Sequence, residues 1–213
     1  MHLMRQQRRK ARFFAESARL RQTGDGRIND MQARGAATLD DLRRVRKKAE
    51  LVGGEIIRMT PAGGRHGYAS GEIFASLREH ARRTGRGCAI GYNVGFIVDL
   101  PNRRSFSPDA AFHFGPLSDD FLDGAPIFAV EIRSKGDYGP AAEARLLAKR
   151  ADYFAAGTLV VWDVDLEPPP CVRVYHAADP ATPSRYVRGE VADAEPAVPA
   201  WSMRVDDLFP RER

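Results

Sequence analysis

Three side chains that could carry out chemistry follow one another in the second half of the chain. Asp109 opens a stretch with strand character, Glu131 lies within a second such stretch, and Lys149 lies on the helix predicted after it. Two carboxylates and a lysine suit metal-assisted phosphodiester hydrolysis, because Mg²⁺ prefers carboxylate oxygens and a bound metal acidifies water. A nearby ammonium group then stabilises the developing negative charge. Only the fold can bring such widely spaced residues together, so the residue types alone leave this chemistry a hypothesis.

The stretch that carries Glu131, residues 127–134, should be a strand with two different faces. Side chains alternate along a strand with period two. The apolar residues at even positions should therefore pack, while Glu131 and Arg133 share the other face with the small Ala129. A buried charge is costly unless it is paired or holds a metal. A structural ion pair between Glu131 and an arginine is the alternative to a functional site.

The other two candidates also have plainer interpretations. Asp109 follows Pro108 and could simply cap the start of strand 107–114, where it would share a face with Ala111 and His113. Lys149 could be a solvated charge on a helix surface, as most lysines are. A site is favoured because the arrangement of Asp109 repeats that of Glu131, with one packed face and one face that sets a carboxylate beside an alanine.

Periodicity, caps and turn residues predict the elements that must position these groups. Thr38 and Asp41 form a capping-box pattern, and Pro140 and Gly157 bracket a long helix. The predicted elements are helices at 39–48, 66–84 and 140–156, strands at 49–59 (broken at Gly53 and Gly54), 88–90, 95–100, 107–114, 127–134, 158–164, 172–175, 185–191 and 201–203, and a helical turn at 205–209.

The two long helices should each present an apolar stripe to the core. In helix 66–84 this stripe is Ile73, Leu77 and Ala81, four residues apart. In helix 140–156 the expected stripe is made by the three residues Leu147, Ala151 and Phe154. Lys149 lies off that stripe, on the side of Arg145 and Tyr153.

Composition bounds the class of protein. With 213 residues, 43% hydrophobic and 29% charged, the chain can build one domain with a real core. No apolar run approaches the ~20 residues that span a bilayer, so no membrane association is expected. Cys88 and Cys171 form no paired motif, which argues against a disulfide framework or a zinc ribbon and predicts a cytoplasmic protein.

The net charge of +5 is unevenly distributed. Residues 1–36 carry nine basic and three acidic side chains, whereas the rest carries 24 basic and 25 acidic ones. We therefore expect a basic, flexible arm at 1–37 and a single domain at 38–213. The arm could bind nucleic acid electrostatically. Alternatively it could be an undocked extension, or follow from a start codon placed too early, with Met31 as the other start.

Several segments in a fixed order resemble the Uma family of "putative restriction endonucleases", within the PD-(D/E)XK nuclease superfamily. The resemblance covers about residues 38–209. The segments are Ser-Pro-Asp at 107–109, Val-Glu-Ile-Arg-Ser at 130–134, Asp-Tyr-Gly at 137–139, the stretch 149–158, Val-Trp-Asp-Val-Asp at 161–165 and, nearer the start, 41–42, 50–59 and 61–67. The order of the segments is specific, whereas each segment alone is not.

The resemblance implies an α/β (α+β) fold with a restriction-endonuclease-like core, in which a mixed central sheet is flanked by helices. It implies Mg²⁺, or Mn²⁺ in its place, held by Asp109 and Glu131. The superfamily's usual lysine, two residues after the acid, is Arg133 here, and arginine cannot relay a proton. The resemblance moves the lysine role to Lys149 and leaves Arg133 as a charge partner or a phosphate contact.

The resemblance also points to two accessory residues. Glu55 could supply a further acidic ligand, although it could equally be an edge-strand residue. His66 could line the site, although a histidine at a helix start is often a capping or packing residue.

Three functions remain open from the sequence. The first is a Mg²⁺-dependent DNA endonuclease, for which a homodimer would suit the cutting of both strands. The second is a nuclease-like module that binds nucleic acid or regulates without turnover, which Arg133 in place of lysine would favour. The third places all DNA affinity in the basic arm.

Overall fold

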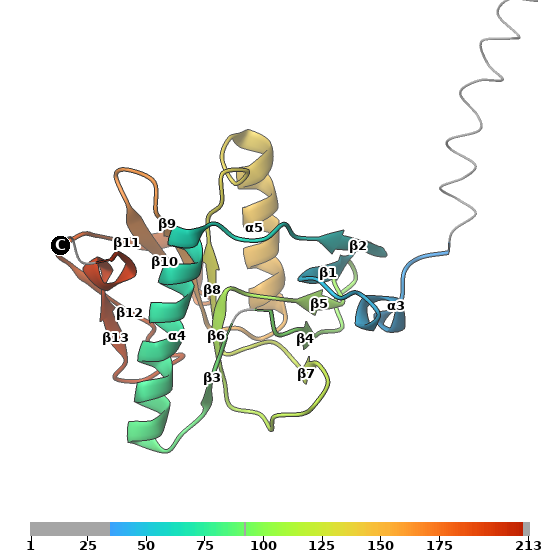
Figure 1. Ribbon diagram of the computed structural model, residues 1–213, viewed down its shortest axis with the longest axis horizontal. Coiled ribbons are helices and arrows are strands. Elements are labelled where there is room, and N and C mark those ends of the chain that lie inside the picture. The colour runs from blue at the N-terminus through green and yellow to red at the C-terminus, as the bar shows by residue number, and fades with distance from the viewer. Residues whose placement is uncertain (1–34, 92, 211–213) are drawn as a thin grey trace, which may run out of the picture. The chain divides into compact units, whose positions relative to one another are not determined.

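A six-stranded mixed sheet organises the chain in the computed structural model, which describes residues 35–91 and 93–210 (Figure 1). The strand order is β11 (Asp179–Val187), β10 (Cys171–His176), β9 (Val160–Asp165), β8 (Phe128–Ile132), β6 (Ala110–His113) and β3 (Cys88–Ile90). β8 and β9 are parallel, and every other neighbouring pair in this sheet is antiparallel. A parallel pair needs a crossover connection, which the helix α5 (Pro140–Ala155) supplies.

Two helices cover the two faces of this sheet (Figure 1). On one face, α4 (Gly64–Thr84) packs Ile73 and Leu77 into a core shared with the even-numbered residues of β8. On the other face, Ala129 of β8 lies in a second core with Tyr153 of α5. The alternation predicted for strand 127–134 is confirmed, and so is the mixed sheet flanked by helices.

Smaller elements surround the sheet. They are α3 (Leu39–Arg43), the hairpin of β1 (Ala49–Val52) and β2 (Glu55–Arg58), the three-stranded sheet of β5 (Ser105–Phe106), β4 (Phe96–Ile97) and β7 (Leu122–Asp123), the pair β12 (Val191–Asp193) and β13 (Ser202–Arg204), and the 3₁₀ turn η1 (Val205–Leu208). Gly53 and Gly54 have φ of 59° and 76°, which suits the two-residue loop of a tight hairpin.

Most predicted helices and strands are present, but predicted strand 185–191 corresponds to β11 at Asp179–Val187, and the short strands β5, β7 and β12 were not predicted. The capping box at Thr38 is present, with Asp41 bonded to it in both directions, although α3 ends at Arg43 instead of near residue 48. α4 ends at Gly85 in the left-handed conformation, as a glycine cap predicts. The predicted arm at 1–37, with Met31, lies outside the described residues except for its last three. Among the described residues, no helix combines the length and hydropathy needed to cross a membrane.

The apolar stripe predicted for α5 is wrong at Leu147 and Ala151, whereas Phe154 packs against the second core as expected. Leu147 is 59% exposed and Ala151 is also exposed, whereas Ala142 and Tyr153 are buried against the sheet. Lys149 lies on this inward side, with its side chain 14% exposed. The helix is turned in this way because the sheet beneath it presents acidic side chains, which bury favourably only against cationic or hydrogen-bonding partners.

Candidate active site

Glu131 and Lys149 form the centre of a buried polar cluster between β8 and α5. The Nζ atom of Lys149 is 2.8 Å from Oε1 of Glu131. One turn further along α5, the Tyr153 hydroxyl donates a hydrogen bond of 2.6 Å to the same oxygen. The ring of Tyr153 stacks on Phe106, with centroids 3.9 Å apart. The helix therefore holds a cation and a donor in fixed positions over the Glu131 carboxylate.

Asp109 joins this cluster from the neighbouring strand. It directly precedes β6, and the pairing of Ala110 with Val130 places Asp109 opposite Glu131. Its Oδ2 atom accepts a 2.8 Å hydrogen bond from the backbone N–H of Ile132. These contacts show more than a strand-start cap, because they fix the carboxylate beside that of Glu131.

Two cationic or polar side chains also hold the Asp109 carboxylate. Lys48 Nζ lies 2.6 Å from Oδ1, and His66 Nε2 lies 3.2 Å from Oδ2. The structure thus brings His66 to the site, as expected for an accessory residue. Lys48 was missed by the sequence reasoning, because it ends the basic run from Arg46 and looks there like an ordinary solvated lysine.

The further acidic residue at the site is Glu50 and not Glu55. Glu50 on β1 is buried, and its Oε1 lies 2.9 Å from Lys149 Nζ. Its other oxygen is 2.6 Å from Arg103 Nη1. Glu55 is exposed on β2, paired with Val52 next to the hairpin turn. The available signal was the one used for Glu131, an acid beside apolar residues in a short strand, and it applies to Glu50 equally well.

Arg133 lies at the end of β8 and serves as a charge partner. Its Nε and Nη2 atoms each lie 2.7 Å from the carboxylate of Asp163, and its Nη1 pairs with Glu143 near the start of α5. Arg133 is only 8% exposed. A phosphate contact would therefore require Arg133 to leave partners that already engage all three of its guanidinium nitrogens.

The charges in the cluster shift the pKa values of its acids in opposite directions. Burial disfavours the ionised form of Asp109, but His66 and Lys48 more than compensate and hold the pKa of Asp109 well below its usual range. Burial raises the pKa of Glu131, and the neighbouring Asp109 and Glu50 carboxylates add to this effect against the opposing charge of Lys149. Glu131 is thus an acid of the cluster whose ionised form is disfavoured.

Lys149 and His66 both have raised pKa values. Burial alone would lower the pKa of Lys149, but the carboxylates of Glu131 and Glu50 raise it above the ordinary lysine value. Burial likewise opposes the charged form of His66, and its hydrogen bond to Asp109 prevails and raises the pKa of His66. Lys149 therefore acts as a fixed positive charge and not as a proton acceptor.

The donor set fits a hard divalent cation. Asp109 and Glu131 present carboxylate oxygens from opposite positions on neighbouring strand segments, and burial, with a smaller effect of the other acids, disfavours the ionised form of Glu131. Within residues 35–91 and 93–210, no group of three or more His, Cys, Asp or Glu side chains forms a metal cage. Mg²⁺ is commonly bound by one or two carboxylates, with water and substrate phosphate completing its shell, so two acids suffice.

Comparisons with known proteins agree with this geometry. The model of the family Uma2, described as "Putative restriction endonuclease", matches residues 37–206. A solved structure from Anabaena variabilis ATCC 29413, titled "putative nuclease belonging to DUF820", superposes with a TM-score of 0.63 at 19% identity, covering 81% of this chain and 97% of that one. At this identity the likeness shows a shared fold. No curated protein matches the chain. Because the family model spans most of its length, the chain belongs to the Uma2 family of restriction-endonuclease-like proteins.

Proposed function

We propose that this protein is a metal-dependent endonuclease that hydrolyses phosphodiester bonds in DNA. The observation that carries the proposal is the convergence in one cluster of Asp109, which directly precedes β6, with Glu131 of β8 and Lys149 of α5. Membership of a family described as restriction endonucleases supports nuclease activity in general. The fold shared with a protein titled a nuclease is consistent with it.

Each residue of the cluster has a distinct role in this proposal. Asp109 and Glu131 would hold Mg²⁺ or Mn²⁺, which when bound acidifies a water molecule and offsets charge on the phosphate. Lys149 keeps its proton and would stabilise the negative charge that develops during attack. Glu50, 2.9 Å from Lys149 Nζ, positions that ammonium group.

Lys48 and His66 would act through the Asp109 carboxylate. Both contact the Asp109 carboxylate and both are cationic or can become so. They orient that carboxylate and offer positive charge near the substrate. Arg133 has no direct part, because its guanidinium group is bound to Asp163 and Glu143.

The test is cleavage of supercoiled plasmid by the full chain with Mg²⁺ or Mn²⁺. Glu131→Gln keeps the shape of the side chain and removes its charge, so we expect cleavage to fall by at least about 100-fold. The matched control is Glu167→Gln, the same change at an exposed position, which should cleave as the wild type does. Cleavage that survives Glu131→Gln would refute the proposal.

One observation favours a second candidate, a nuclease-like module that binds nucleic acid without cleaving it. Lys48 and Lys149 already neutralise Asp109 and Glu131 at 2.6 Å and 2.8 Å, which is how a site without a metal would be stabilised. Calorimetric titration with Mg²⁺ and Mn²⁺ separates the two candidates. The binding module predicts no metal uptake, salt-dependent DNA binding and no products with any divalent cation.

A further inference from the structure

A groove of about 680 Å³ lies beside the Asp109 end of the cluster. Its walls come from the base of the β1–β2 hairpin, the segment that follows β2, the first half of α4, and the residues after β3. Two residues join the groove to the site. Lys48 lines it and contacts Asp109 Oδ1, and Ser70 lines it and donates a 2.6 Å hydrogen bond to the Asp109 carbonyl.

The charge of this groove is suited to a nucleic acid strand. Its described lining includes Lys47 and Lys48 at one side and no Asp or Glu, and apart from Thr60, Ser70 and Asn93 the rest of the lining is apolar. Because Lys48 is paired with Asp109, the attraction for a phosphate at this side comes chiefly from the exposed Lys47, and the apolar residues offer a surface for a ring. A carboxylate would repel the substrate strand, and none faces it in the described part of the groove.

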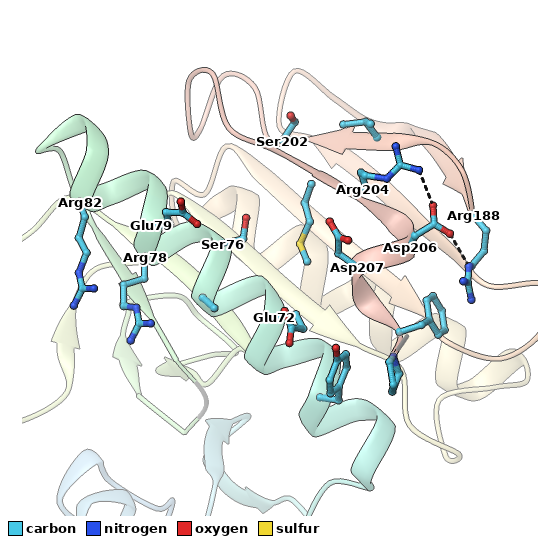
Figure 2. Close-up of a pocket in the computed structure, with 16 residues that line it drawn as sticks. Glu72, Ser76, Arg78, Glu79, Arg82, Arg188, Ser202, Arg204, Asp206 and Asp207 are labelled. Atoms are coloured by element: carbon cyan, nitrogen blue, oxygen red, sulfur yellow. Dashed lines mark hydrogen bonds and ion pairs between the residues drawn. The ribbon is translucent and has the colours of Figure 1, made fainter. Parts of the chain in front are cut away.

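The larger hollow of the molecule has a different character. It occupies about 1300 Å³ between α4 and the C-terminal strands, away from Asp109, Glu131 and Lys149. Figure 2 shows acidic side chains interleaved with arginines along it, including Asp206 between Arg188 and Arg204. Arg188 and Arg204 pair with Asp206, and the described lining holds four acidic residues against four arginines, so this hollow lacks the uniform positive charge that suits a phosphate backbone.

The shape of the smaller groove is set by glycines and one aromatic ring. Gly67 and Gly71 lie one turn apart on α4, and a Cβ atom added to either would meet no atom within 4 Å. Phe74 adds a half-buried aromatic wall, and its ring lies 3.5 Å from the position that a Cβ of Gly91 would take. Open backbone beside an aromatic side chain is a surface on which a nucleobase can lie.

We propose that this groove binds an unstacked nucleobase next to the phosphate being hydrolysed, so that the substrate is single-stranded or locally unpaired DNA. This inference rests on the proposed function. Bases of an intact duplex are stacked and paired, and extruding one costs a few kcal/mol. Few polar side chains line the groove, and the hydroxyl of Ser70 is already bonded to Asp109, so the groove selects an unpaired base with little preference for its identity.

The test fills the groove from the helix without disturbing the site. Gly71→Leu places a side chain in open space, and Gly71→Ala is the matched control that adds only a methyl group. Both replacements favour the helix over glycine, so thermal unfolding should show no loss of stability. Binding is measured by fluorescence anisotropy with labelled 15-mer oligothymidylate and with a duplex of the same length, with Ca²⁺ in place of Mg²⁺.

The wild type should bind the single strand at least about tenfold more tightly than the duplex. Gly71→Leu should weaken single-strand binding about tenfold or more, whereas Gly71→Ala should not. Phe74→Ala should weaken it by at least about fivefold, which corresponds to the loss of one base–aromatic contact.

The outcomes test the groove assignment separately from the nuclease proposal. Undiminished single-strand binding by Gly71→Leu, or a wild type that prefers duplex, overturns the groove assignment even if the protein cleaves DNA. Loss of binding in Gly71→Leu, together with an absence of products from the wild type with any divalent cation, keeps the groove and overturns the nuclease proposal.

Discussion

Removal of the positive charge at Lys149 tests how the cluster is held together. Lys149 bridges Glu131 and Glu50 at 2.8 Å and 2.9 Å, and the three side chains are 14%, 17% and 4% exposed. Lys149→Met keeps an unbranched apolar stem of similar length and deletes only the ammonium group. The two carboxylates would then lie buried without their shared cation.

The structure gives the size of the expected effect. Breaking a buried ion pair from one side costs about 3–5 kcal/mol, a large part of the ~5–15 kcal/mol that stabilises a typical domain. Glu50 would keep its contact with Arg103, whereas Glu131 would keep only the hydroxyl of Tyr153. Most of the loss should therefore come from Glu131. Adding Glu131→Gln to Lys149→Met should restore stability, with a coupling energy of about 1.5–3 kcal/mol.

The stability lost in Lys149→Met should be smaller at lower pH. Without Lys149, the pKa of Glu131 rises further above its unfolded value, so the folded variant binds the proton more tightly and gains stability as the pH falls. In the wild type, Lys149 and Arg103 overcome burial and lower the pKa of Glu50, and this contribution is lost only as the pH falls below about 4.3. The difference between the two proteins should shrink as the pH falls from 7 toward about 4.3, the ordinary glutamate value.

Urea unfolding followed by tryptophan fluorescence at pH 7 and pH 5 measures this difference. The buried Trp162 and Trp201 report loss of the core. Lys135→Met, the same substitution at an exposed position, is the control and should change stability by less than about 0.5 kcal/mol. A Lys149→Met protein that stays within about 1 kcal/mol of the wild type at pH 7 would refute the reasoning.

Two further substitutions test neighbouring contacts. Arg133→Lys loses the pair of parallel hydrogen bonds to Asp163, so the free energy of unfolding should fall by about 2 kcal/mol. The salt dependence of DNA binding should stay unchanged. A smaller dependence on salt would instead show that Arg133 contacts a phosphate. Tyr153→Phe keeps the ring and removes its hydrogen bond to Glu131, so urea unfolding should show a loss of about 1 kcal/mol. Equal stability would mean that the hydroxyl adds nothing to Glu131.

The parts of the fold that depend on short-range rules could be predicted from the sequence. Alternation in strand 127–134 correctly divided its residues between two cores, because a strand covered on both faces leaves no other arrangement. The capping box at Thr38 and the glycine stop at Gly85 were equally readable, since each satisfies backbone groups within a few residues. Asp109, Glu131 and Lys149 were proposed from their residue types and from the order of motifs that the resemblance added, and the structure brings Glu131 and Lys149 into contact.

The orientation of α5 could not be predicted by the same reasoning. A hydrophobic stripe identifies the buried face of a helix only where the surface beneath it is apolar. Beneath α5 that surface carries Glu131, so the helix turns Lys149 and Tyr153 inward and leaves Leu147 exposed. Glu50 carries the same local signal as Glu131, but only the fold shows that it pairs with Lys149, which is 99 residues away in the sequence.

The contacts of Lys149 and Tyr153 with Glu131, which set the orientation of α5, also determine what the site can do. Its three acids, Glu50, Asp109 and Glu131, are matched by cationic side chains, so the cluster is stable as it stands. Lys48 and Lys149 can turn toward a phosphate only if another cation takes over the carboxylates that they now contact. Phosphate and divalent cation would then enter by an exchange of partners, in which each buried charge stays compensated. A site balanced in this way needs no free group of acids, and the described residues contain none.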